Sequence, residues 1–123
     1  MATFNKFNSF VEAVAEKVHN LGSDTLTIAL TAAANAPVAT NTKLSDLTQI
    51  SYTNLSSRVI TTTSSSQTSG TYKLVLQDLT LTASGTVADF RYVVIYNDTA
   101  TNDELIGWYD YGSTVSLTSG DSL

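Results

Sequence analysis

Two apolar runs separated by a polar stretch dominate the pattern of the chain. The first, Phe90 to Tyr96, is rich in aromatic and β-branched residues, which predicts a strand buried on both faces. Residues 97–103 are polar and turn-prone, and Leu105 to Tyr111 then resumes as a strand that Gly112 is expected to end. We therefore expect this pair of strands to form the centre of a small β domain.

A helical pattern occupies Phe7 to Leu21. Asn8 or Ser9 is expected to cap its start, and Lys17 and His19 fall in its last turn, where positive charge favours the helix dipole. The apolar residues at helical spacing, which predict one buried stripe, are Phe7, Phe10, Val11, Val14, Val18 and Leu21.

Shorter patterns with a period of two surround these elements. Asp24 to Leu30 alternates cleanly and predicts a half-buried strand, and residues 31–44 form a long connection without periodicity. A threonine-rich strand is expected at Ser57 to Thr63, a polar loop or hairpin tip at residues 64–70, and a further strand at Tyr72 to Leu76.

About seven short strands led by one helix define the expected fold class. The pattern of residues 46–50 fits either a short helical turn or a strand. Val115 and Leu117 are expected to begin a last short strand. The pattern predicts a mainly β protein, an antiparallel sandwich or barrel with one N-terminal helix. We expect a single domain over residues 1–123, with an arm at 1–6, the helix at 7–21 and the β domain at 24–118.

Composition and charge narrow the possible partners. Charged residues make up only 14% of the 123 residues, cysteine is absent, and the formal net charge is -5. The six basic residues are scattered and form no basic stripe, so a nucleic-acid partner is not expected. The acidic balance is interpreted as a solubility feature.

Targeting signals are also missing from the pattern. No apolar run approaches the roughly 20 residues that a membrane helix needs, so no membrane partner is expected. The first ten residues lack a charged region followed by an apolar one, and so do not resemble a secretory signal. We expect the chain to be made and folded in a cytoplasm.

Titratable groups offer few candidates for chemistry. His19 is the only histidine, and without a nucleophile or metal-ligand motif beside it a structural role is favoured. The acidic residues Asp98, Asp103, Glu104 and Asp110 would suit a glycosidase pair or a calcium site, but their spacing fits no EF-hand loop. We expect no enzyme activity, no cofactor and no metal.

Aromatic residues offer a second set of candidates. Trp108, Tyr109 and Tyr111 suggest a carbohydrate platform, but alternation along a strand separates Trp108 from the two tyrosines, which favours a role in the core. Phe4 lies on the predicted arm, outside the helix, where the core does not account for it. Packing of this arm on a neighbouring subunit is the hypothesis for Phe4.

Four stretches carry a family resemblance: FNKFNSFVEAVAEKVHNLGSDTLTIALT, APVATNTKLSDLTQIS, SSQTSGTYKL and FRYVVIYNDTATNDELIGWYDYGSTVSL. Together they cover most of the chain, which resembles a family of small virion structural proteins of tailed bacteriophages. The resemblance implies a capsid decoration, or cement, protein that binds the outer surface of the assembled head. Such a protein staples subunits of the major capsid protein together, and many cement proteins are homotrimers.

Contact residues are expected where the core needs the chain least. The candidates on the arm and in the long connection are Thr3, Phe4, Lys6, Pro37, Thr40 and Lys43. The acidic surface would meet basic patches on a capsid exterior, and binding would then be sensitive to salt.

Three other readings remain open at this point. A tail- or fibre-associated virion protein would share the same composition. A carbohydrate-binding module would require an exposed Trp108, and a hydrolase would require His19 to act on a substrate.

Overall fold

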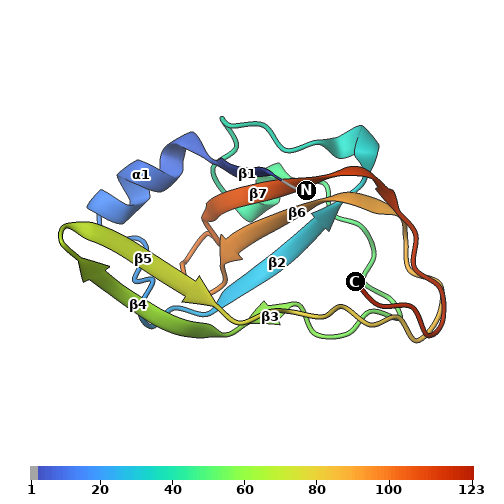
Figure 1. Ribbon diagram of the computed structural model, residues 1–123. Helices are drawn as coiled ribbons and strands as arrows, with labels where there is room; N and C mark the ends of the chain where they lie inside the picture. Colours follow the sequence, from blue (N-terminus) through green and yellow to red (C-terminus); the bar gives the residue numbers. More distant parts are fainter. Residues whose placement is uncertain (1–2) are drawn as a thin grey trace.

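The computed structural model describes residues 3–123 and confirms a mainly β fold with one α-helix near the N-terminus (Figure 1). Its seven strands within that range are β1 Thr3–Lys6, β2 Leu26–Thr31, β3 Val59–Ile60, β4 Thr62–Thr68, β5 Thr71–Leu76, β6 Phe90–Asn97 and β7 Leu105–Val115. All pairings are antiparallel, in a five-stranded sheet of order β1-β7-β6-β2-β3 and a two-stranded sheet of β4 and β5. The barrel that the strand count allowed is not closed.

The two central strands lie where the pattern predicts them. β6 is flanked by β7 on one side and β2 on the other, and most of its residues are buried. β7 is longer than expected, because Gly112 lies within it and does not end it. The register shifts between Phe90 and Tyr92 of β6, so β7 bulges opposite these residues. Gly112 lies in this bulge with a φ of 96°, a conformation that glycine adopts more readily than other residues.

β2 is buried on both faces, which corrects the prediction of a half-buried strand. All six of its residues are buried. Leu26, Ile28 and Leu30 pack in the main core, whereas Ala29 packs in a second cluster with Phe7. The start of α1 and the connection that follows β2 lie against this second face and cover it. The alternation of apolar and polar residues in β2 therefore did not predict a face exposed to water.

The helix is shorter than the predicted span of Phe7 to Leu21. α1 covers Asn8–Ala15, Phe7 is its N-cap residue, and no side chain caps it. Lys17 takes a left-handed φ of 67°, which ends the helix, so His19 lies beyond it. The predicted buried stripe is also wrong in its middle, where Val11 and Val14 are 55% and 45% exposed.

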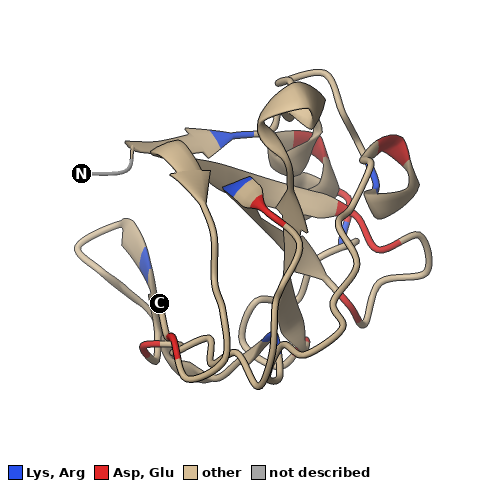
Figure 2. Ribbon diagram, turned by 90° about the vertical axis from the view of Figure 1, so that its right-hand side faces the viewer, with Lys and Arg blue, Asp and Glu red and all other residues tan. Residues whose placement is uncertain are grey.

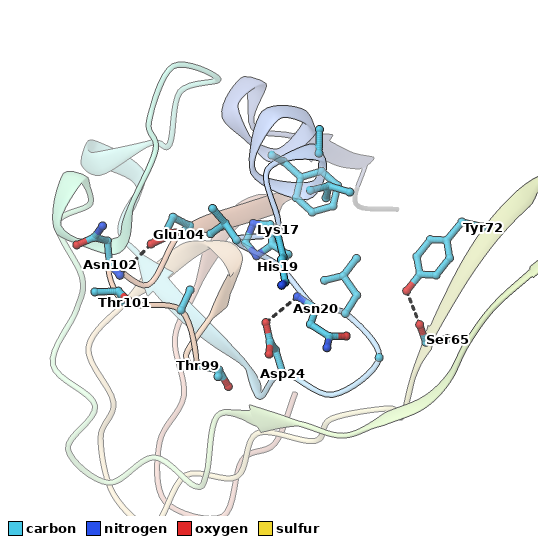
Figure 3. A pocket seen from close by; sticks show the side chains of 17 residues that line it. Lys17, His19, Asn20, Asp24, Ser65, Tyr72, Thr99, Thr101, Asn102 and Glu104 are labelled. Carbon is cyan, nitrogen blue, oxygen red and sulfur yellow. Dashed lines mark hydrogen bonds between the residues drawn. The ribbon is translucent and has the colours of Figure 1, made fainter.

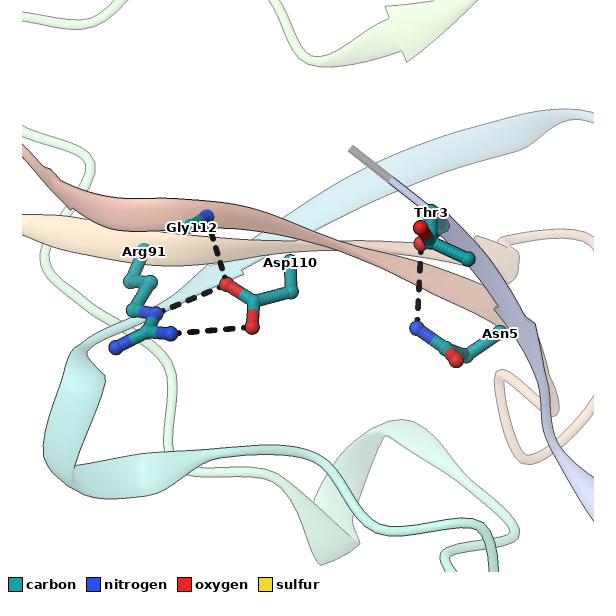
Figure 4. A network of polar contacts seen from close by, with 5 residues as sticks. All are labelled: Thr3, Asn5, Arg91, Asp110 and Gly112. Carbon is teal, nitrogen blue, oxygen red and sulfur yellow. Dashed lines mark hydrogen bonds and ion pairs between the residues drawn. The ribbon is translucent and has the colours of Figure 1, made fainter. Parts of the chain in front are cut away.

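The predicted N-terminal arm is a strand. β1 pairs with β7 from Thr3 opposite Asp110 to Lys6 opposite Gly107 (Figure 4). The Phe4 ring lies over Gly107, and a Cβ at that position would collide with it. The absence of a side chain at Gly107 therefore leaves room for the Phe4 ring of β1 to pack against β7.

The serine-rich segment is also a strand, which corrects the predicted polar loop at residues 64–70. β4 begins at Thr62 and pairs with β5 up to Thr68, so only Ser69 and Gly70 form the turn, both with positive φ. The strand predicted at Ser57 to Thr63 is thereby divided between the short β3 and the start of β4. Nearly all of β4 is exposed. Its extended conformation therefore comes from backbone pairing with β5 and from the turn, and burial contributes little.

The connections between strands contain two short 3₁₀ helices. These span Ala33–Asn35 and Leu44–Asp46, so of residues 46–50, for which a helical turn and a strand were both open, Asp46 ends a 3₁₀ helix and the other four belong to neither. Val115, which was expected to begin a last strand, is the end of β7. Leu117 is buried in the main core without belonging to a strand.

Candidate functional site

The two predicted contact stretches lie end to end along one margin of β7. β1 pairs with residues 107–110 of β7. At the start of β7, the Leu105 amide donates to the Thr42 carbonyl at 3.0 Å, and Lys43 forms an isolated bridge with Glu104. We call the surface formed by Thr3–Lys6 and residues 40–43 the β7 margin.

Most of the predicted contact residues are exposed on this margin. These are Thr3, Phe4, Lys6, Thr40 and Lys43. The sixth, Pro37, is buried, so its prediction as an accessible contact is wrong. The turn that follows it is closed by a 2.9 Å hydrogen bond from the Val38 amide to Asn41 Oδ1, and Val38 is the exposed apolar residue there.

Negative charge gathers at one end of the β7 margin. Asp98, Asp103 and Glu104 belong to the connection between β6 and β7, and Glu104 forms the bridge with Lys43. Figure 2 marks the acidic positions of the ribbon in red and the basic ones in blue. Partial burial raises the pKa of Asp103, and the negative charges of Asp98 and Glu104 raise it further.

A broad cleft lies between α1, the hairpin of β4 and β5, and the β6–β7 connection (Figure 3). It has a volume of about 1060 Å³, and Phe10, Leu21, Tyr72 and Thr101 are among the residues that line it. Its polar lining includes His19, which was predicted to lie in the last turn of the helix. The loop after α1 instead carries this side chain under the cleft, where it is 7% exposed.

A buried network organises this region around Asn97. Asn97 Nδ2 lies 2.9 Å from His19 Nδ1 and donates to Asp24 Oδ2 at 2.6 Å. Asn97 Oδ1 accepts from the amides of Thr99 and Ala100 at 3.0 and 3.1 Å. The side chain thereby joins the loop after α1, the start of β2 and the β6–β7 connection. Sequence reasoning assigned Asn97 to a turn and missed this role.

The contacts and the burial of His19 suit a structural role. Since both Asn97 Nδ2 hydrogens are donated, His19 Nδ1 accepts and its proton lies on Nε2. Nε2 is buried and has no hydrogen-bond partner within residues 3–123. Because Nδ1 is engaged by Asn97 and Nε2 is buried, neither ring nitrogen is exposed to a molecule in the cleft, and the ring centroids of Phe10 and His19 lie 5.4 Å apart.

Protonation of His19 is expected to destabilise the fold. Burial lowers the pKa of His19 from its ordinary 6.5, and the nearby carboxylates of Glu104 and Asp24 oppose this only in part. The neutral form therefore contributes stability that is complete above pH 6.5 and is lost as the pH falls from there toward the folded-state pKa. We predict that the difference in unfolding free energy between the native protein and His19→Asn, measured by urea titration, shrinks from about pH 7.5 to about pH 5.5.

A matched substitution in the same loop provides the control. Lys17→Gln replaces an exposed side chain of the same loop and leaves the buried imidazole in place, so its difference from the native protein should stay constant over this pH range. A His19→Asn difference that grows or holds steady as the pH falls would contradict the assignment of a neutral, buried imidazole.

The acidic residues considered for a glycosidase pair or a calcium site do not all lie together. Asp110 forms a two-point ion pair with Arg91, at 2.9 and 3.2 Å, and accepts from the Gly112 amide (Figure 4), and these bonds lower its pKa. It is therefore apart from the acidic groups of the β6–β7 connection. Within residues 3–123 no three His, Cys, Asp or Glu side chains are grouped to hold a metal ion.

The aromatic residues of β7 do not form a sugar platform. Trp108 is half-buried, and its ring centroid lies 4.6 Å from that of the buried Phe7. Tyr109, on the opposite face, packs with Phe4 at 5.2 Å. The side chains are divided between two faces, as alternation predicted.

Comparison with known proteins gave no match among protein families, curated proteins or solved structures. No helix in the part of the chain described is long and apolar enough to cross a membrane.

Proposed function

We propose that this protein is a bacteriophage capsid decoration protein that binds the outer surface of the assembled head. It would stabilise contacts between major capsid protein subunits, and it would do so as a homotrimer. The sequence resemblance motivates the proposal, and the β7 margin is the observation that supports it best. Two stretches distant in sequence border the same strand, since β1 pairs with residues 107–110 of β7 and Thr42 bonds to Leu105 at its start, and most of their residues are exposed.

The chemistry of this surface suits passive binding. It combines an exposed aromatic ring, Phe4, with two lysines, and the acidic β6–β7 connection adjoins it. An aromatic residue supplies contact area, and the charges supply orientation toward a partner of opposite sign. Many copies on one shell would turn a weak single contact into strong retention.

Co-sedimentation with empty capsid shells, and separately with tails, tests the proposal. We expect saturable binding to shells in a fixed ratio to the major capsid protein, with weaker binding at high salt because exposed charges contribute. Phe4→Ser combined with Lys43→Glu should reduce binding, whereas Ser113→Ala, on the exposed bulge of β7, serves as the control. Binding to tails without binding to shells would reject the proposal in favour of a tail- or fibre-associated protein.

A further inference from the structure

Two strand edges without a partner face each other across an open side of the molecule. β1 is the end strand of the five-stranded sheet, and β5 pairs only with β4. Phe4 from β1 and three residues of β5, Tyr72, Leu74 and Leu76, line one cavity of about 310 Å³. The five-stranded sheet and the hairpin of β4 and β5 thus enclose a common interior, where Leu74 and Leu76 pack against the main core, and within residues 3–123 no strand pairing joins β1 to β5 (Figures 1 and 2). We call this opening the β1–β5 seam.

The interior of the β1–β5 seam is apolar along its length. A second cavity of about 420 Å³ shares Leu76, Ile95 and Tyr109 with the first and extends past Tyr111 to Leu123. Asp78 is the single charged residue in the two linings. An occupant must therefore bring apolar side chains, and a charged one would lose its hydration without gaining a partner.

The backbone of β5 specifies what kind of molecule fits. Because a two-residue turn joins Thr68 to Thr71, these two residues form a hydrogen-bonded pair, and every second residue of β5 bonds to β4. The backbone groups of Tyr72 and Leu74 consequently point away from β4, into the seam. Their side chains line the cavity as well, so the seam offers amide groups and apolar contacts together. An extended polypeptide satisfies both, whereas a lipid or a small apolar ligand leaves the amides unpaired.

The hairpin itself gains from such a strand. An isolated two-stranded ribbon is only marginally stable in water, and β4 and the first half of β5 are exposed almost throughout. We propose that the β1–β5 seam accepts an extended segment of a partner polypeptide as an added strand, with large apolar side chains at alternate positions. This inference does not rest on the capsid proposal, although both involve β1 and Phe4, and its tests therefore use substitutions in β5 and at Tyr111.

Peptide binding provides the first test. The probe is an acetylated and amidated peptide as long as β5, of alternating valine and threonine, with a terminal lysine for solubility and a fluorescent label. We expect saturable binding by fluorescence anisotropy, and at least about tenfold weaker binding of the same peptide N-methylated at alternate residues. Equal affinity for both peptides would overturn the proposal, because hydrophobic contact alone would then explain the binding.

Two substitutions and a matched control locate the binding site. Leu74→Lys should weaken peptide binding at least about tenfold, because it places a charge inside the seam. Tyr111→Lys changes an exposed rim residue, so it tests the seam even if Leu74→Lys folds poorly. Lys73→Thr alters the neighbouring residue, whose backbone faces β4, and should leave the affinity within about twofold. Unchanged affinity in both Leu74→Lys and Tyr111→Lys would overturn the assignment.

Amide exchange tests the pairing directly. Bound peptide should slow exchange at the Tyr72 and Leu74 amides and leave the Thr71 and Lys73 amides, already paired with β4, nearly unchanged. Binding without this alternating protection would refute strand addition. Protection that rises with protein concentration alone would show a second copy in the seam, and the assignment to a separate partner segment would be wrong.

Discussion

Replacing Phe7 by alanine is expected to lower the free energy of unfolding by about 3–5 kcal/mol, the usual cost of deleting a buried aromatic ring. Phe7 is 0% exposed and packs against Trp108, Val94 and Leu105 in the second core cluster. It is also the residue from which α1 starts, so its loss frees the helix from the sheet. Urea unfolding followed by tryptophan fluorescence measures both effects, because Trp108 is the single tryptophan and reports on this contact.

Phe4→Ala is the matched control for this prediction. The ring removed is the same, but Phe4 is 47% exposed and packs over Gly107 on the opposite face of β7. We expect a loss of about 1 kcal/mol and an unchanged Trp108 emission spectrum. If Phe7→Ala cost no more than Phe4→Ala, the second core cluster would not stabilise the fold as the packing implies.

Asn97→Ala is expected to cost about 3 kcal/mol, because it leaves a buried ring nitrogen and two backbone amides in part-buried hydrogen bonds without their partners. The affected groups are His19 Nδ1 and the amides of Thr99 and Ala100, while Asp24 loses one of its donors. The loss should appear as a lower urea midpoint together with faster amide exchange at Thr99 and Ala100.

Asn102→Ala provides the comparison within the same connection. Asn102 is exposed, and its recorded hydrogen bond is made by its backbone amide to Glu104, so the side chain can be removed at a cost of about 0.5 kcal/mol or less. A comparable loss in both variants would mean that the network around Asn97 has no special role.

The central strands could be predicted from sequence because their composition leaves few alternatives. Aromatic and β-branched residues in Phe90 to Tyr96 suit a strand in any context, and burial on both faces follows from the lack of polar alternation. The serine-rich β4 could not be predicted, because serine favours loops. The pairing of β4 with β5 and the Ser69–Gly70 turn override that preference, and neither is visible in a local window.

The start of the helix could be predicted from the sequence, but its end and its buried face could not. Its start was placed within a residue, since the apolar pattern begins at Phe7, but its end depends on the left-handed backbone of Lys17. Nothing in the local sequence requires that conformation, and the apolar Val18 and Leu21 extend the pattern past it. Val11 and Val14 fit the period equally well yet point to solvent, because the sheet reaches only one end of this short helix.

The candidate contact residues remain predictions from the sequence, and the structure adds how they are arranged. Exposed, aperiodic stretches with an unexplained aromatic residue identified Phe4 and Lys43, but only the sheet topology places them along one strand. Asn97 and Asp24 carry no sequence signal, because their contacts with His19 connect distant parts of the chain. Pro37 was misplaced because a proline in a loop is usually exposed, and here it is buried.

The order of strands in the larger sheet governs how the chain can reach its native state. β1, at the beginning of the chain, pairs with β7 near its end, and β2 pairs with β6. β1 has no strand neighbour until β7 has left the ribosome, and β2 has only the two-residue β3 until β6 follows, so little of the sheet can assemble during synthesis. Closing such long loops costs entropy before any contact offsets it, which places folding of this topology in the range of milliseconds to seconds. During that interval the free edges of β1 and β2 are open to the wrong partners, and crowded nascent chains would be the first of these.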